Sequence, residues 1–216
     1  KMPTQPLSIY SELEQAYNLF RANIHNPKSV LYPCCATDAT PSNAFANVTY
    51  VDINQEFITV LQQAKLNAHN QDIRTYRPTQ PHDLLILLNP AIPPNCATKH
   101  LQKNGYIIAN NWHDTSTALH QQSNLFQLYA TVNYQIPPPA ISTDLTDLFH
   151  PVKDEQELQH YRPDHYAFMK KVISSFAYQG IIPTSQNASF TQQLQAFCQA
   201  MDKEMPSRRV ADLYVF

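Results

Sequence analysis

Glycine is almost absent from this sequence, with two residues among 216, where average usage of about 7% would give about 15. A turn that needs a positive φ must therefore be built from residues that carry a side chain. The G-x-G-x-x-G fingerprint of dinucleotide-binding proteins is missing as well. Charged residues make up 15% of the chain and the net charge is -2, which argues against a strongly basic, nucleic-acid-binding surface.

Long apolar runs and paired cysteines are also lacking. The longest apolar run, residues 84–88, has the length of a strand, far below the about 20 residues of a membrane-spanning helix. Residues 1–8 contain no apolar stretch of the kind found in signal peptides. We therefore expect a reduced, cytoplasmic protein without a membrane span and without a metal site. The four cysteines form neither a CxxC pair nor a zinc spacing: Cys34, Cys35, Cys96 and Cys198.

Apolar segments of strand length alternate with helical patterns through the first two thirds of the chain. This alternation predicts an α/β fold with a doubly wound, mostly parallel sheet. Residues 83–88 are almost wholly apolar, as in a central strand that is covered on both faces. The predicted strands are 30–32, 48–53, 72–74, 83–88, 105–109 and 125–133. The predicted helices are 9–23, 55–67, 97–103 and 115–122, with a short helix after the first strand whose N-cap and first residue would be Thr40 and Pro41.

The pattern changes at the three prolines of residues 137–139. Two helices are predicted beyond them, one from Pro163 to Gly180 and one that begins at Ser189, where Gln192 completes a capping box. A last strand is predicted within residues 210–216. The expected organisation is therefore an α/β domain of residues 1–136 and 207–216, with residues 137–206 as a helical insertion or lid.

Polar residues follow several of the predicted strands. Ligands of open α/β sheets bind beyond the carboxyl ends of the strands, so these positions are the candidate site. Asp52 ends the second strand, where a carboxylate can accept both hydroxyls of a ribose; a helix N-cap is the alternative role. Asp72 is a candidate acceptor for an adenine amino group.

The order of these segments resembles class I S-adenosylmethionine-dependent methyltransferases. The family's first motif consists of a strand, a turn and an acid, and it corresponds here to VLYPCCATD. Its second motif contains the acid that binds the ribose, and it corresponds to YVDIN with Asp52. QDI, DLLILLNPAI and NGYIIANN are similar to the segments around its third, fourth and fifth strands. The terminal ADLYVF is similar to its antiparallel seventh strand, which would pair beside LFQLYATVN. The resemblance covers about residues 25–135 and the last seven, and it depends on order and spacing rather than on any single motif.

This resemblance implies a Rossmann-like fold with an antiparallel C-terminal strand and a helical insertion. It also implies S-adenosylmethionine as the cofactor and S-adenosylhomocysteine as the product. The glycine-free turn places side chains where the family's backbone approaches the cofactor. The implied cofactor contacts are Pro33, Cys34, Cys35, Ala36, Thr37, Asp38, Asp52, Ile53, Asp72, Ile73 and Asn89.

Asn89, Pro90 and His113 are the candidate catalytic residues. Asn89-Pro90 resembles the start of the Asn-Pro-Pro-aromatic motif of enzymes that methylate amino nitrogens, in which the Asn oxygen orients the target amine. The next two residues, Ala91 and Ile92, lack the aromatic ring, and a strand-terminating Asn-Pro turn is the alternative. His113 is the candidate base for an acceptor that needs deprotonation, with a surface histidine as the alternative.

Three functions remain open from the sequence. The first is a methyltransferase whose acceptor, a small molecule or a protein, is unknown. The second is a binding module on a methyltransferase-like scaffold that has lost its cofactor, which the glycine-free turn favours. A nicotinamide or other nucleotide enzyme is the third, against which the missing fingerprint and the ADLYVF strand both count.

Overall fold

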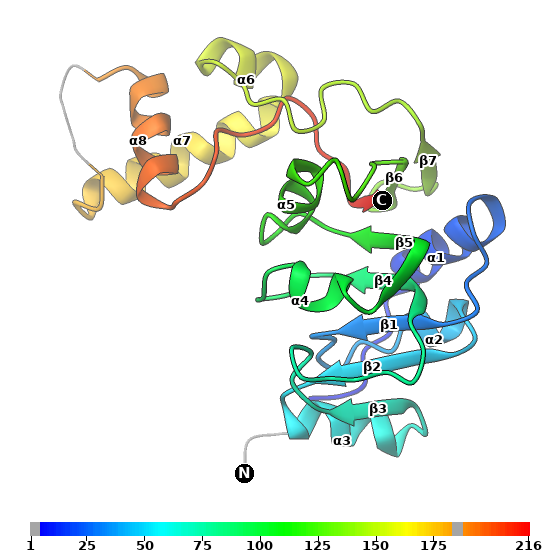
Figure 1. Ribbon diagram of the computed structural model, residues 1–216. Helices are drawn as coiled ribbons and strands as arrows, with labels where there is room; N and C mark the ends of the chain where they lie inside the picture. The colour runs from blue at the N-terminus through cyan, green and yellow to red at the C-terminus, as the bar shows by residue number, and fades with distance from the viewer. Residues whose placement is uncertain (1–4, 183–187) are drawn as a thin grey trace. The chain divides into compact units, whose positions relative to one another are not determined.

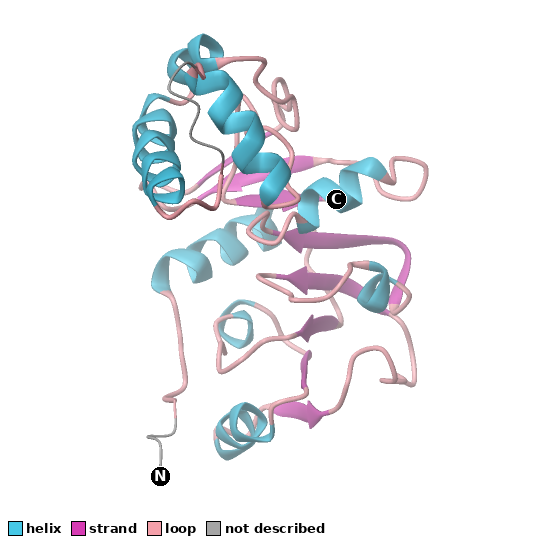
Figure 2. Ribbon diagram, turned by 90° about the vertical axis from the view of Figure 1, so that its left-hand side faces the viewer, coloured by secondary structure: helices cyan, strands magenta, loops and turns pink. Residues whose placement is uncertain are grey.

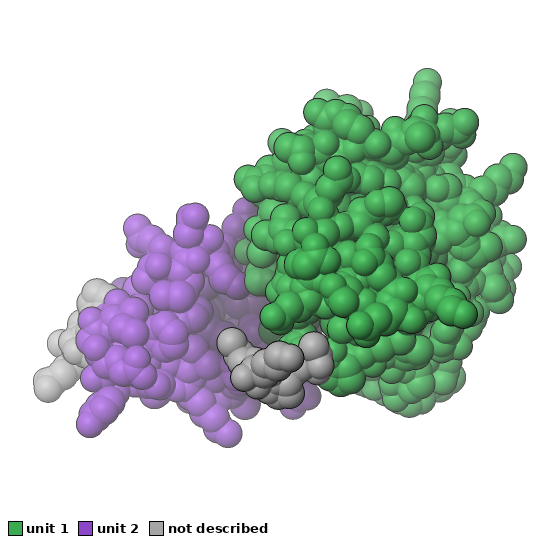
Figure 3. Space-filling view, turned by 90° about the horizontal axis from the view of Figure 1, so that it is seen from below, with its two compact units in different colours: residues 1–144, 211–216 green, residues 145–210 purple. Residues whose placement is uncertain are grey.

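The computed structural model describes residues 5–182 and 188–216. The chain forms two compact units, which are coloured separately in Figure 3. The first consists of residues 1–144 and 211–216, and the second of residues 145–210.

The first unit contains one sheet, in which the described residues form eight strands in the order β3-β2-β1-β4-β5-β8-β6-β7 (Figure 1). The strands β3, β2, β1, β4 and β5 are parallel to one another. Strand β8 lies between β5 and β6 and is antiparallel to both. The predicted fold class and the predicted place of the C-terminal strand are therefore confirmed. The strands are β1 (Val30–Pro33), β2 (Val48–Asp52), β3 (Asn67–Asn70), β4 (His82–Leu87), β5 (Leu101–Ala109), β6 (Ala130–Asn133), β7 (Ala140–Ser142) and β8 (Leu213–Val215).

Helices cover both faces of this sheet (Figures 1 and 2). Helices α1 (Ser11–Asn23), α2 (Pro41–Ala44) and α3 (Gln55–Gln63) lie on one face, and α4 (Asn95–Thr98) and α5 (Thr115–Gln121) lie on the other. Every side chain of β4 is buried, as the apolar run predicts for a central strand. Helix α1 buries the residues that recur at helical spacing in its sequence: Leu13, Ala16, Tyr17 and Phe20.

The third strand departs from the sequence prediction. Helix α3 ends at Gln63, because Lys65 takes a left-handed conformation with φ of 62° and turns the chain into β3. Strand β3 pairs with β2 alone, at the edge of the sheet, where polar side chains are tolerated. Apolar patterning therefore misses it, and Asp72 and Ile73 lie in the turn that follows rather than in a strand.

The second unit is helical, with α6 (Glu155–Tyr161), α7 (Pro163–Tyr178) and α8 (Phe190–Ala200). The capping box of Ser189 and Gln192 is present at the start of α8, and Gly180 follows α7 with φ of 71°. The sequence predicts an insertion at residues 137–206, whereas this unit runs from 145 to 210, because β7 joins the sheet of the first unit. Its role as a lid stays a prediction. Its core consists of Val152, Leu158, Met169, Ile173, Ile182, Leu194 and Cys198.

No helix within the described parts of the chain combines the length and the apolar character needed to cross a membrane.

Gly105 marks a close contact between β4 and β5. A Cβ atom at this position would lie 2.7 Å from Leu101 Cδ1 and 3.0 Å from the Asp83 carbonyl oxygen. We expect Gly105→Ala to lower the free energy of unfolding by about 1–3 kcal/mol, measured by urea denaturation. Leu101→Ala removes one of the two atoms involved, so the double variant should lose less stability than the sum of the single variants. If the losses of unfolding free energy in the two single variants add up to the loss in the double variant, the proposed contact between a Cβ at residue 105 and Leu101 is wrong.

Candidate functional site

The turn after β1 takes left-handed conformations without glycine. Cys34 has φ of 53° and Ala36 has φ of 49°, at a cost of about 1–2 kcal/mol for each residue with a Cβ. Burial raises the pKa of the Cys34 thiol to about 11 and that of Cys35 further still. Both thiols are therefore protonated at neutral pH and act as small apolar groups rather than as nucleophiles.

Asp52 holds this turn in place from the neighbouring strand. Its Oδ2 accepts a hydrogen bond of 3.1 Å from the Ala36 amide, and its Oδ1 accepts one of 2.9 Å from the Asn54 amide. The N-cap of α3 is Asn54, whose side chain accepts from two amides of the first turn, so the alternative role for Asp52 is filled by another residue. A carboxylate offers about four acceptor positions. These two bonds use two of the positions on Asp52, so two remain for a ligand. Ile53, the next residue, is 72% exposed.

Asp38 is a buried carboxylate at the end of the turn, with 8% of its surface exposed. Its Oδ1 accepts hydrogen bonds from the Thr40 amide (2.9 Å) and the Thr40 hydroxyl (2.5 Å), and its Oδ2 accepts one from the Tyr32 hydroxyl (3.0 Å). Burial raises the pKa of Asp38, and these hydrogen bonds offset part of that rise. Within residues 5–182 and 188–216, no lysine, arginine or histidine forms an ion pair with it.

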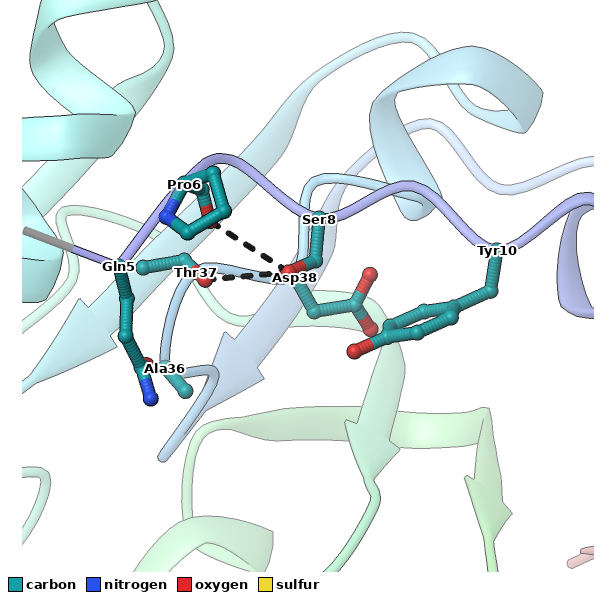
Figure 4. Close-up of a pocket in the computed structure, with 7 residues that line it drawn as sticks. All are labelled: Gln5, Pro6, Ser8, Tyr10, Ala36, Thr37 and Asp38. Atoms are coloured by element: carbon teal, nitrogen blue, oxygen red, sulfur yellow. Dashed lines mark hydrogen bonds between the residues drawn. The ribbon is translucent and has the colours of Figure 1, made fainter.

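A cavity of about 270 Å³ lies beside Asp38 (Figure 4). The segment of residues 5–10, here called the N-terminal strap, borders it on one side and the turn borders it on the other. The Ser8 amide donates to the Thr37 carbonyl and the Ala39 amide donates to the Ser8 carbonyl, both at 2.9 Å. A ligand in the cavity would meet hydroxyl, amide and carboxylate oxygens, a set that suits an ammonium group. The lining residues are Gln5, Pro6, Ser8, Tyr10, Ala36, Thr37 and Asp38.

Asp72 and Ile73 lie outside the lining of this cavity. Arg74 holds the Asp72 carboxylate through Nη2–Oδ2 and Nε–Oδ1 contacts of 2.5 and 2.9 Å, and these hydrogen bonds lower the pKa of Asp72 to about 2. Ile73 is buried. The structure thus gives Asp72 a protein partner and gives Ile73 a place in the core.

Asn89 and Asn110 pair at the ends of the neighbouring strands β4 and β5. The Asn110 side-chain amide donates to Asn89 Oδ1 at 2.8 Å, and the Asn89 backbone amide donates to Asn110 Oδ1 at 3.1 Å. Asn89 has φ of 50° and is exposed, whereas Pro90 is buried. The oxygen that the resemblance assigns to a target amine therefore already accepts one protein hydrogen bond.

His113 lies on the loop between β5 and α5, where its side chain is exposed. The neighbouring Trp112 is 74% exposed. Because β4 and β5 are parallel neighbours, this loop starts at the same edge of the sheet as Asn89. Among the described residues no group of three His, Cys, Asp or Glu side chains has a geometry that could hold a metal ion.

Sequence reasoning misses the N-terminal strap and the roles of Tyr32 and Thr40. The sequence suggests Ser8 as the N-cap of a helix over residues 9–23, but α1 begins at Ser11 and Ser8 bonds to the turn. A bond between residues that lie about thirty positions apart leaves no local signal, because it depends on how α1 packs against the sheet. The sequence predicts Thr40 as the N-cap of a short helix, and it does precede α2, but its hydroxyl makes no capping bond and bonds to Asp38 and Tyr10 instead.

Strand order and the first turn identify the fold. Five parallel strands, with an antiparallel C-terminal strand inserted between β5 and β6, form the arrangement that the motif resemblance implies. The chain has the Rossmann-like fold of class I S-adenosylmethionine-dependent methyltransferases. The turn after β1, where the resemblance places the family's first motif, contains no glycine.

Comparisons with known proteins give matches among solved structures. No protein-family model and no curated protein matches the sequence. The chain is similar to a sugar N-methyltransferase from a Streptoalloteichus species, at 15% identity over 49% of each chain with a TM-score of 0.42.

Two further similar structures carry a cofactor or its product. One is the N-methyltransferase NodS from Bradyrhizobium japonicum in complex with S-adenosylhomocysteine, at 16% identity over 45% of this chain and 60% of that one, with a TM-score of 0.38. The other is an S-adenosylmethionine-bound amino pentose methyltransferase from Micromonospora echinaspora, at 16% identity over 48% and 52%, with a TM-score of 0.41. The match spans between 49% and 60% of the length of these three proteins.

Replacing Ala36 by glycine tests the strain in the turn. Glycine has no Cβ to clash at φ of 49°, and its extra freedom in the unfolded chain offsets only part of that gain. We therefore expect Ala36→Gly to raise the free energy of unfolding by about 0.5–1 kcal/mol, measured by urea denaturation. Ala64, an exposed residue with φ of -78°, is the control, and Ala64→Gly should give no gain. Equal effects at the two positions would show that the turn is unstrained.

Proposed function

We propose that this chain is an S-adenosylmethionine-dependent methyltransferase that binds its cofactor at the carboxyl edge of β1 and β2. The observation that carries the proposal is the first turn, which keeps two left-handed residues without glycine and is bonded to Asp52. Residues with a side chain hold such a conformation only where the surrounding structure compensates for the strain. Strain that persists at the place of the family's cofactor turn supports a retained cofactor site.

The residues around this turn suit the parts of the cofactor. The remaining acceptor positions of Asp52 are available to ribose hydroxyls, and the exposed Ile53 side chain offers an apolar surface to the adenine. Thr37 and Asp38 line the cavity in which the ammonium group of the methionine part would bind. Asp72 and Asn89 already accept hydrogen bonds from Arg74 and Asn110. They would contact the cofactor only if these bonds break or if the same oxygens accept a second bond.

A bound S-adenosylmethionine would supply an electrophilic methyl group, with S-adenosylhomocysteine as the product. Methyl transfer needs no covalent enzyme group, because in-line positioning of the acceptor supplies most of the acceleration. We assign that positioning to Asn89 and Pro90, and proton removal, where the acceptor needs it, to His113. The acceptor itself stays unassigned.

A binding module without methyl transfer is the second candidate. It is favoured by the hydrogen bond between Asn110 and Asn89 Oδ1 and by the ion pair between Arg74 and Asp72. In both cases a protein partner bonds to an oxygen that the resemblance assigns to ligand binding. A chain of this kind would bind the cofactor weakly or not at all.

Calorimetric titration separates these candidates. We expect saturable heat with S-adenosylmethionine and with S-adenosylhomocysteine, and none with NADH or ATP, because the proposed site would bind a methionine-bearing nucleoside. No response to either sulfur compound at millimolar concentration would exclude the methyltransferase. That result would favour the binding module, because such a chain has lost its affinity for the cofactor.

Asp38→Asn should weaken ligand binding without destabilising the protein. Loss of a charge-assisted contact predicts an affinity for S-adenosylmethionine lower by about tenfold or more. Because the pKa of Asp38 is raised in the folded state, the folded protein binds the proton more tightly than the unfolded chain. This contribution to stability is therefore present at low pH and is lost as pH rises through the folded pKa.

Denaturation of both proteins at several pH values checks this sign. The variant should gain stability relative to the parent protein as pH rises from about 4 to 7. Glu56→Gln, which removes an exposed carboxylate from the first turn of α3, is the control and should change neither property. A variant that binds S-adenosylmethionine as tightly as the parent would remove Asp38 from the site.

A further inference from the structure

The N-terminal strap is bonded to the turn at Ser8 and Tyr10. Besides the two backbone bonds of Ser8, the Ser8 and Thr37 hydroxyls lie 3.3 Å apart, and the Tyr10 amide donates to Thr40 Oγ1 at 3.0 Å. Figure 4 shows the strap running from Gln5 to Tyr10 alongside the turn that carries Ala36, Thr37 and Asp38. The strap therefore forms one wall of the cavity and the turn forms the opposite wall.

Thr40 joins the strap to the buried carboxylate. Its side chain is fully buried, its hydroxyl accepts the Tyr10 amide, and the same hydroxyl donates to Asp38 Oδ1 at 2.5 Å. The bonds form a chain from the Tyr10 N–H through the Thr40 O–H to the Asp38 carboxylate. Hydrogen bonds in such a chain polarise one another, so an ionised Asp38 makes Thr40 Oγ1 a better acceptor for the strap.

Asp38 is the group in this cluster whose charge changes in the acidic range. The titratable groups that face it are phenols and a thiol, and burial raises the pKa of each, so all of them stay neutral from acidic to neutral pH. The charge on Asp38 has no counter-ion within the described parts of the chain. The groups with a raised pKa are Tyr17 of α1, Tyr32 of β1, Cys35 of the turn, Tyr50 of β2 and Tyr134 after β6. Tyr10 of the strap lines the same cavity as Asp38.

We propose that Thr40 couples the N-terminal strap to the charge of Asp38, so that an ammonium group bound beside Asp38 and closure of the strap favour each other. The ligand half of this coupling rests on the proposed function, whereas the link between the strap and Asp38 does not. Coupling of this kind is reciprocal: the ligand slows opening of the strap, and an anchored strap raises the affinity for the ligand. Thr40 is then a positioning residue that acts through Asp38 and Tyr10.

Amide hydrogen exchange and calorimetry on two variants test the coupling. Thr40→Val keeps the shape of the side chain and removes both hydroxyl bonds, so the Ser8 and Tyr10 amides should exchange about tenfold faster and S-adenosylhomocysteine should bind about tenfold more weakly. Thr40→Ser retains the hydroxyl and should restore both properties. Thr59→Val, on the exposed side of α3, is the matched control.

Two outcomes would overturn the proposal. One is strap exchange in Thr40→Val within twofold of the parent protein. The other is a loss of affinity that Thr40→Ser fails to restore, since that pattern reports a packing defect rather than a lost hydroxyl.

A ligand-free arm separates this proposal from the proposed function. In the parent protein, lowering the pH through the titration of Asp38 should speed exchange at the Tyr10 amide beyond the intrinsic pH effect, and in Asp38→Asn it should not. If neither sulfur compound binds, the proposed methyltransferase function is wrong, but the ligand-free exchange experiment still tests the coupling between Asp38 and the strap. Equal pH dependence in the two proteins would overturn the coupling even where the cofactor binds.

Discussion

The hydrogen bond from the Ala36 amide to Asp52 is the interaction on which the candidate site depends. Parallel pairing of β1 with β2 places Pro33 opposite Val51, so Asp52 follows at the level of the turn. The carboxylate stabilises a left-handed Ala36 that would otherwise relax to negative φ. With Ala36 in this conformation, Thr37 meets the strap and Asp38 reaches Tyr32 and the cavity.

Charge is distributed unevenly around this turn. Asp72 is balanced by Arg74, and Asn89 is paired with Asn110, so both groups contribute to a stable edge of the sheet. Asp38 is hydrogen-bonded but unbalanced, and burying its charge costs stability. A group that is unfavourable for folding and faces a cavity is typical of a binding site rather than of a structural contact. Asp38 differs from Asp72 and Asn89 because it borders the cavity and has no ion-pair partner among the described residues.

Much of the sheet could be predicted from sequence, and much of the site could not. β1, β2 and β4 carry enough apolar residues to mark them, and β8 was placed by its resemblance to a terminal strand. β3 and β7 are short edge strands, and edge strands need no apolar run. The turn could be located but its conformation could not, because left-handed residues other than glycine have no reliable sequence signal. The pairing of Asn89 with Asn110 likewise depends on two strand ends that meet only in the sheet.

The sequence by itself determined the alternation of strands and helices, the fold class and the position of the turn. These features follow from the local periodicity of apolar residues, from the capping residues and from the order of the motifs. Only the tertiary structure decided which polar groups are available to a ligand. Availability depends mainly on partners far apart in the chain: Asn110 pairs with Asn89 from the neighbouring strand end, and Ser8 and Tyr10 contact the turn from a segment about thirty residues away. Asp72 is the exception, because its partner Arg74 lies two residues further along the chain. The other contacts join segments that meet only in the folded sheet, so a linear sequence does not record them.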